Sequence, residues 1–269
     1  MKTRTIALAV ALTALSLQAA AHRPFLLPSS TVVESRDPWV TIDGAIAENL
    51  FDFDTNALGL DGVAVTAPDG SVLAAPAIVK SRLRSSFDLR LAQTGTYKVA
   101  LVTDSVMASY KVGEETRRFR GSAAAFAREV PANSAELKTS YNQARLETFV
   151  TNTRPTDAAL KATGKGLEMV PLTHPNELRA GEPARWRFQL DGKPLAQFAF
   201  SVIPGGVRYR GVLGEMRLAT DAKGEASVTV PDAGMVWLSA NYPQNRTRGP
   251  ADNGERRYSY AATLEVLPP

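Results

Sequence analysis

FDLRLAQTGTYKVALVTD, residues 87–104, contains the two short runs that decide the fold class. In the first run, apolar residues at 87, 89 and 91 alternate with charged residues at 88 and 90. In the second run, Tyr97, Val99 and Leu101 alternate with Lys98 and Ala100, and a Thr-Gly pair separates the two runs. A period of two is typical of a strand with one buried face. The stretch therefore predicts two antiparallel strands joined by a turn.

The residues before this stretch continue the same pattern. Short apolar runs at 31–33 and 39–42 precede an Asp-Gly pair, and VAVTAPDGSVL (63–73) places Asp69-Gly70 between two further runs. An Asp-Gly pair between two such runs is a strong hairpin signal. We expect residues 22–120 to form an N-terminal β-sandwich of immunoglobulin-like or transthyretin-like type.

The middle of the chain has a different composition. Between Gly121 and Val150, Ala, Glu, Arg and Lys accumulate, and Leu137, Tyr141, Ala144 and Thr148 fall at helical spacing. This pattern predicts one or two short helices, broken near Pro131. The polar, turn-rich stretch 151–166 is the best candidate for a linker, so 121–163 is interpreted as a helical segment and linker.

The second half returns to strand patterns. In RWRFQL, Trp186, Phe188 and Leu190 alternate with polar residues, and Asp191-Gly192 and Lys223-Gly224 mark turns. Six runs at this spacing predict a second β-sandwich of the same type over residues 164–269. The expected fold is mainly β, with two β-sandwiches and a short helical segment between them.

The N-terminus predicts export. Lys2 and Arg4 precede an apolar run at 6–17, which leads into Ala19-Ala20-Ala21, an A-x-A cleavage signal. The run is too short to span a bilayer, which takes about 20 residues as a helix. We expect residues 1–21 to be a signal peptide cleaved after Ala21, which leaves 248 of 269 residues (269 minus 21) in the periplasm and none in the membrane.

Composition narrows the function classes. The net charge of +4 falls to +2 once Lys2 and Arg4 are removed, which gives no ground for nucleic-acid binding. The chain has no cysteine, so it has no disulfide, no thiolate ligand and no lipid-modified cysteine. It also lacks a G-x-S-x-G motif and a nucleotide-binding loop. The sequence predicts a protein that is not an enzyme.

Metal binding is the chemistry that the cleavage site suggests. The chain has two histidines, His22 and His174. After cleavage, His22 would offer its α-amine and its imidazole to one ion, and Pro24 has no amide N–H to continue a chelate along the backbone. This donor pair suits divalent Ni, Co or Cu. His174, in a turn before Pro175, is the one imidazole that could add a third nitrogen.

Several side chains could add oxygen ligands. The candidates are Asp52 and Asp54 of the FDFD run (51–54), Glu34, Tyr258 and Tyr260. Two of the proposed ligand groups also have an interpretation without a metal. The FDFD run fits an edge strand with solvated carboxylates, and His174 fits a solvated turn residue. The predicted metal set is therefore His22, His174, Asp52 and Asp54.

Two other segments carry a possible binding role. In PGGVRYRGVLGE (204–215), Arg208 and Arg210 would share a face if they lay on a strand and could bind an anion, although a hairpin with solvated arginines fits as well. The polar stretch 241–260 predicts a long loop, and loops of that length are commonly functional.

These residues resemble a known family. The start AHRPFLLPSS and the segments GKGLEMVPLTHPNELRAGEPARWRFQLDGKPLA (164–196) and TDAKGEASVTVPDAGMVWLSA (220–240) are similar to a domain-of-unknown-function family of Gram-negative periplasmic proteins grouped with periplasmic components of nickel and cobalt uptake. Its members begin, after the signal peptide, with a histidine followed shortly by an aromatic residue, as His22 and Phe25 do here. The resemblance implies a periplasmic accessory protein for metal acquisition.

Three hypotheses follow. The leading one is a periplasmic accessory protein that binds a divalent transition metal, or a metal complex, for an uptake system, with a membrane transporter or outer-membrane receptor as partner. The second is a metal-independent scaffold module that contacts a membrane receptor or a carbohydrate. The third is an oxidative copper enzyme, which requires the imidazoles of His22 and His174 to meet.

Overall fold

The fold is mainly β, as the sequence predicts, and it is seen here in a computed structural model that describes residues 22–245, 249–250 and 254–269. The predicted signal peptide, 1–21, lies outside the described residues, as do parts of the predicted 241–260 loop. Within the described ranges, no helix has the length and apolarity that crossing a bilayer requires.

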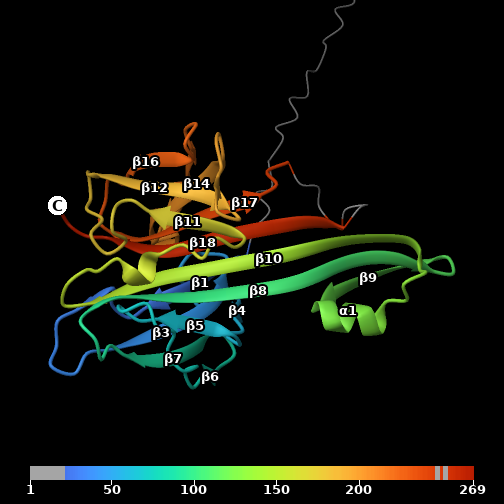
Figure 1. Ribbon diagram of the computed structural model, residues 1–269, viewed down its shortest axis with the longest axis horizontal. Helices are drawn as coiled ribbons and strands as arrows, with labels where there is room; N and C mark the ends of the chain where they lie inside the picture. Colours follow the sequence, from blue (N-terminus) through green and yellow to red (C-terminus); the bar gives the residue numbers. More distant parts are fainter. Residues whose placement is uncertain (1–21, 246–248, 251–253) are drawn as a thin grey trace, which may run out of the picture.

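One long sheet runs through the whole molecule (Figure 1). We call it the shared sheet. Its strands, in spatial order, are β15 (Met216–Ala219), β14 (Ala199–Pro204), β17 (Gly234–Tyr242), β18 (Glu255–Val266), β10 (Ala135–Asn152), β8 (Gly95–Val112) and β5 (Val63–Thr66). Two further strands, β2 (Val32–Val33) and β9 (Glu115–Gly121), pair with β10 and β8 respectively.

Two small sheets lie on opposite faces of the shared sheet (Figure 1). The N-terminal small sheet contains β1 (Arg23–Pro28), β3 (Trp39–Ala47), β7 (Ser85–Arg90) and β6 (Val79–Lys80), with β4 (Asn56–Ala57) paired to β3. The C-terminal small sheet contains β11 (Leu167–Pro171), β12 (Pro183–Leu190), β13 (Lys193–Pro194) and β16 (Glu225–Thr229). Each small sheet and the face it covers form one sandwich.

The shared sheet supplies both cores through the alternation of its side chains. On β10, Phe149 belongs to the C-terminal core and Val150 to the N-terminal core. On β18, Tyr260 and Ala261 divide in the same way. Successive side chains of a strand point to opposite faces, so two neighbouring residues can pack in two different cores.

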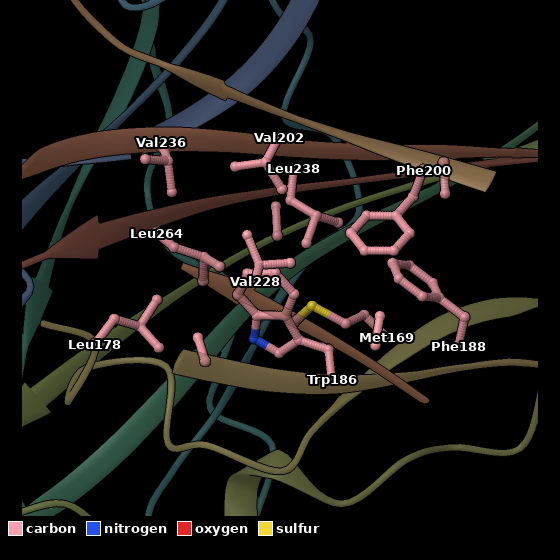
Figure 2. Close-up of a cluster of buried hydrophobic side chains, with 14 of the residues drawn as sticks. Met169, Leu178, Trp186, Phe188, Phe200, Val202, Val228, Val236, Leu238 and Leu264 are labelled. Atoms are coloured by element: carbon pink, nitrogen blue, oxygen red, sulfur yellow. The ribbon is translucent and has the colours of Figure 1, made fainter. Parts of the chain in front are cut away.

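Aromatic residues fill the C-terminal core. Figure 2 shows Met169 beside the indole of Trp186, and the rings of Phe188 and Phe200 close to each other. Those two rings have centroids 4.9 Å apart, and Trp186 is completely buried. The alternation predicted for residues 185–190 is therefore confirmed by the packing of Trp186 and Phe188.

The predicted helical segment is only partly present. Helix α1 (Ala123–Glu129) begins after Ser122, whose side chain accepts a hydrogen bond from the amide of Ala125. The helical interpretation of Leu137 to Thr148 is wrong, because those residues lie in the 18-residue strand β10. From Arg145 onward β10 is buried on both faces, so the polar alternation that normally marks a strand is missing.

The predicted linker is fixed to the body of the protein. It includes the 3-10 turn η1 (Ala158–Leu160) and connects β10 to β11. Thr156 exchanges two hydrogen bonds with Thr96, and Thr163 donates both its amide and its hydroxyl to Glu168. The shared sheet crosses both predicted domain boundaries, so the two sandwiches are not joined by a free tether.

The distal parts of β8 and β10 project beyond the sandwiches (Figure 1). We call these parts, together with β9 and α1, the arm. Phe119 of β9 and Phe126 of α1 pack with centroids 5.7 Å apart, which holds the helix on the arm. The arm is thus an extension of the shared sheet.

A buried ionic network links the shared sheet to the C-terminal small sheet. Arg145 lies 3.3 Å from Glu147 and 3.9 Å from Glu168, with all three side chains at least nine-tenths buried. Tyr260 donates to Glu147 at 2.7 Å, and Gln189 donates to Glu168 at 3.1 Å. Removing the single cation of this group would leave two buried carboxylates uncompensated.

We therefore expect Arg145→Leu to lower the free energy of unfolding by about 3–5 kcal/mol, measured by denaturant titration. The matched control is Arg128→Leu, because Arg128 pairs with Glu129 at the surface and such pairs contribute little. Equal effects of the two changes would contradict the role given to the network.

Candidate functional site

His22 lies at the surface, immediately before β1. Its side chain is 56% exposed, and its Nε2 atom lies 3.6 Å from Oε1 of Glu48. Glu48 comes directly after β3, and Arg23 of β1 pairs with Ala47 of β3, so the antiparallel register brings the two residues together. Glu48 was not predicted from the sequence, because its proximity to His22 depends on a pairing between segments 26 residues apart (48 minus 22).

Asp54 fixes the loop that carries Glu48. Its carboxylate accepts hydrogen bonds from the amides of Glu48 and Asn49, from the Asn49 side chain and from the Thr55 hydroxyl. Burial alone would raise the pKa of Asp54, but these hydrogen bonds outweigh it and lower the pKa. Both carboxylate oxygens are therefore engaged in holding the loop, so Asp54 positions Glu48 and does not stand as a free ligand.

Asp52 lies in the wall of a cleft that this loop shares with the C-terminal sandwich. The cleft has a volume of about 440 Å³, and Phe51, Gly205 and Met235 also line it. We call it the terminal cleft. The ring of Phe51 packs edge-on against Phe25 with centroids 5.3 Å apart, which anchors the loop to β1.

The arginines of residues 204–215 do not share a strand face. Val207–Arg210 form the four-residue helical turn α2, so the alternative in which Arg208 and Arg210 share a strand face does not apply. Arg210 donates to the carbonyls of Pro204, Gly205 and Leu213. Its guanidinium therefore stabilises this loop.

His174 belongs to a closed circuit of four hydrogen bonds. The amide of Asn176 donates to Nδ1 of His174 at 3.2 Å, so the ring proton is on Nε2, which lies 3.0 Å from the Thr96 hydroxyl. Thr96 donates to the Thr151 hydroxyl, and Thr151 donates to the Asn176 side chain, both at 2.9 Å. We call this group the His174 circuit. Each member both donates and accepts within it.

The His174 circuit ties the shared sheet to the C-terminal sandwich. Thr96 and Thr151 pair with each other on the shared sheet, whereas His174 and Asn176 belong to the turn between β11 and β12. Both nitrogens of His174 are used, and burial lowers its pKa, with the carboxylates of Glu177 and Asp157 opposing the shift. This geometry describes a neutral, structural histidine.

The two histidines lie at opposite ends of β1. Thr151 donates its amide to the carbonyl of Thr31, so the His174 circuit is beside the chain that follows β1. His22 precedes the other end of the same strand. The six residues of β1 extend over about 20 Å, so the two imidazoles cannot share an ion. The copper enzyme hypothesis requires the imidazoles of His22 and His174 to bind one ion, and their separation does not allow this.

The oxygen donors considered for the site are also separated. Tyr260 is buried in the ionic network, and Tyr258 lies near the base of the arm. Within the described residues, no three His, Asp or Glu side chains are placed to hold one ion. A metal site at His22 would therefore need the α-amine that cleavage creates.

The positive charge of Arg23 is accommodated by its neighbours. Arg23 donates to the carbonyl of Glu48 at 2.8 Å. Burial would raise the pKa of Glu215, but hydrogen bonds from Ser201 and Arg217 and the charges of Arg217 and Arg23 lower it. Glu215 is itself paired with Arg217, so the direct partner of Arg23 is the carbonyl of Glu48.

Fold and site together define a protein of two β-sandwiches on one shared sheet, with an exposed histidine–glutamate pair where β1 begins. The chain belongs to the family described as domain of unknown function DUF4198, whose model matches residues 19–244. No curated protein matches the chain. Neither the family description nor the mainly β fold points to an enzymatic activity.

Two solved structures align over most of the chain at low similarity. One is trypsin-activated alpha-2-macroglobulin from Escherichia coli, at 13% identity over 92% of this chain and 16% of that chain, with a TM-score of 0.23. The other is the D0-D1 domain of intimin, at 12% identity over 90% of this chain and 97% of that one, with a TM-score of 0.21. Neither alignment superposes well enough to transfer a ligand or a role.

The His174 circuit predicts a pH-dependent stability. Because the folded pKa of His174 is lowered, the unfolded chain takes up a proton near pH 6.5 that the folded protein accepts only at lower pH. The free energy of unfolding of the native protein should therefore fall as the pH drops through about 6.5. The difference in the free energy of unfolding between the native protein and His174→Gln should decrease across the same pH range, as measured by denaturant titration at several pH values.

The matched change is His22→Gln, which keeps the His174 circuit and should keep the native pH dependence. If the free energy of unfolding depended on pH in the same way in the native protein and in His174→Gln, a neutral His174 in the folded state would be contradicted.

Proposed function

We propose that the chain is exported to the periplasm, cleaved after Ala21, and binds a divalent transition metal at the new N-terminus as a non-catalytic accessory protein of an uptake system. The resemblance of residues 164–196 and 220–240 to proteins grouped with nickel and cobalt uptake supports this proposal, as does the leader-like N-terminus. The observation that carries it is the pairing of exposed His22 with Glu48 at 3.6 Å.

The geometry of an N-terminal histidine explains why that pairing matters. The α-amine and Nδ1 close a six-membered chelate ring on one ion, whereas Nε2 is on the far side of the imidazole. Nε2 is the atom that faces Glu48. The separation of 3.6 Å is an ion-pair distance, longer than a hydrogen bond. A small side-chain rotation would let Glu48 accept the second N–H of a ligating His22, and a carboxylate in that position fixes the ring orientation and raises its basicity.

The surroundings hold Glu48 in this position. Asp54 binds the amides of Glu48 and Asn49, and Arg23 binds the Glu48 carbonyl. The backbone of Glu48 and the amide of Asn49 are therefore fixed. This reduces the conformational entropy that the loop would lose on binding an ion.

The donor set limits the metal and the way it is held. An amine and an imidazole suit borderline metals, with affinity rising through Co(II) and Ni(II) to Cu(II). Two protein nitrogens leave further coordination positions for water, a small chelator or a partner protein. Such a site releases its ion readily, as delivery to a membrane transporter or outer-membrane receptor requires.

The alternative is a scaffold module that needs no metal. The observation in its favour is the exposed apolar tip beside the terminal cleft, where Tyr209 is 87% and Val212 63% exposed. An exposed aromatic of this kind is suited to a protein contact with a membrane receptor. This alternative predicts that Tyr209→Ala abolishes partner capture and that metal has no effect on it.

The proposed site can be tested by titrating protein that begins at His22 with Ni(II), Co(II) and Cu(II) in a calorimeter. Acetylating the α-amine of His22 should weaken binding most, because an acetylated amine cannot bind the ion and the chelate ring is lost. Glu48→Gln should weaken binding by about 10-fold, as expected for a residue that orients a metal ligand.

The matched control is His174→Gln, which removes the other histidine and should leave the affinity unchanged. Unchanged binding after acetylation of the α-amine would refute the terminal chelate, and equal losses from His22→Ala and His174→Gln would point to unspecific imidazole binding.

A further inference from the structure

A second cleft lies at the base of the arm. It has a volume of about 330 Å³ and is lined by residues of β8, β10 and β18, with Ala123 of α1 at one side. We call it the arm cleft. None of its lining residues belongs to the His22–Glu48 pair or to the His174 circuit, so the proposed metal site does not account for it.

The strand register places the cleft's side chains on one face. Tyr141 pairs with Val106 on β8 and with Arg256 on β18, whereas Gln143 pairs with Asp104 and Tyr258. Directly paired residues point to the same face, and so do residues two apart on one strand. The face therefore presents two adjacent rows of side chains, which are Arg256, Tyr141 and Val106 in one row and Tyr258, Gln143 and Asp104 in the other.

This face is the one that turns toward the C-terminal sandwich. Tyr260, two residues after Tyr258, is in the C-terminal core. A Cβ on Gly166 would lie 3.1 Å from Cδ of Gln143 and 3.7 Å from the Tyr258 ring, so the backbone before β11 approaches the second row closely. The cleft is thus bounded by α1 at one side and bordered by the C-terminal sandwich.

The polar groups of the cleft have both signs. Asp104 accepts a hydrogen bond from Gln143 at 3.1 Å, which orients the amide beside the carboxylate. The guanidinium of Arg256 lies 6.0 Å from the centroid of the Tyr141 ring. Arg257 pairs with Glu255, whereas within the described residues no carboxylate is at ion-pair distance from Arg256.

The aromatic surface is accessible. Tyr141 is 40% exposed, and Tyr258, also in the cleft, is half-buried. Tyrosine rings offer an apolar face together with a hydroxyl group that both donates and accepts hydrogen bonds. The cleft therefore combines an acceptor, several donors and apolar ring surface within one small volume.

This combination selects the class of ligand. An anion would meet the carboxylate of Asp104, and a cation would meet the guanidinium of Arg256. A neutral polyol uses both, because its hydroxyls donate to the carboxylate and accept from the guanidinium and amide, while its C–H face packs on tyrosine. The volume is at the lower end of the range for small-molecule sites and accommodates about one or two sugar rings.

We propose that the arm cleft binds a neutral saccharide. Tyr141 and Tyr258 supply the packing surface, and Asp104, Gln143 and Arg256 supply the hydrogen bonds. The binding requires no metal and does not depend on cleavage at Ala21.

The experiment is saturation-transfer NMR on the protein from His22 to Pro269, with maltose and N,N′-diacetylchitobiose as neutral probes and galacturonate and glucosamine as charged ones. We expect transfer to at least one neutral probe at millimolar concentration and weaker transfer to both charged probes. Tyr141→Ala should abolish the signal, and Tyr141→Phe, which keeps the ring, should retain most of it.

Asp104→Asn is the second variant, in case Tyr141→Ala disturbs the folding of the arm. It removes the negative charge but keeps the shape of the side chain. It should reduce transfer to the neutral probe severalfold. Tyr209→Ala, at the terminal cleft, is the matched control and should have no effect. Transfer to no neutral probe, stronger transfer to a charged probe, or undiminished transfer in Asp104→Asn would overturn the proposal.

Discussion

The parallel pairing of β10 with β18 is the interaction on which the rest of the structure depends. It runs from Ser140 beside Glu255 to Thr148 beside Thr263 and joins strands that are more than 100 residues apart in the chain. Without it the molecule would be two sandwiches on a tether. With it, one sheet has a core on each face, and neighbouring residues such as Phe149 and Val150 pack in different cores.

This shared sheet also determines where chemistry can occur. Between the two small sheets most of its side chains are buried, and polar groups there pair with one another, as in the Arg145 network and the His174 circuit. Free groups remain at the margins. One margin is the beginning of β1, where His22 meets Glu48, and another is the base of the arm, where the shared sheet extends beyond the C-terminal small sheet. The two proposed sites are therefore independent of each other.

The alternation of residues within short segments predicted much of the fold. It could not predict contacts between segments that are distant in the chain. The alternation at residues 87–91 and 97–101 is confirmed because each of these strands has one face on the N-terminal core. The same reasoning failed for β10. In its exposed first half the few apolar residues, Leu137, Tyr141 and Ala144, are spaced as in a helix, and its second half is buried on both faces, so no polar alternation marks the strand. His22 was recognisable as a candidate ligand from the cleavage signal beside it. Glu48 was not, since it requires the β1–β3 register, and the residues of the His174 circuit come from three separate segments.

The central claim is that cleavage turns an ordinary histidine into a chelating terminus, and the position of the cut tests it most directly. The measurement is the intact mass, with N-terminal sequencing, of the protein recovered from the periplasm of cells that express the full chain. The account predicts a chain of 248 residues (269 minus 21) that begins at His22. A mature chain that begins at any other residue, or an uncleaved one, would contradict it.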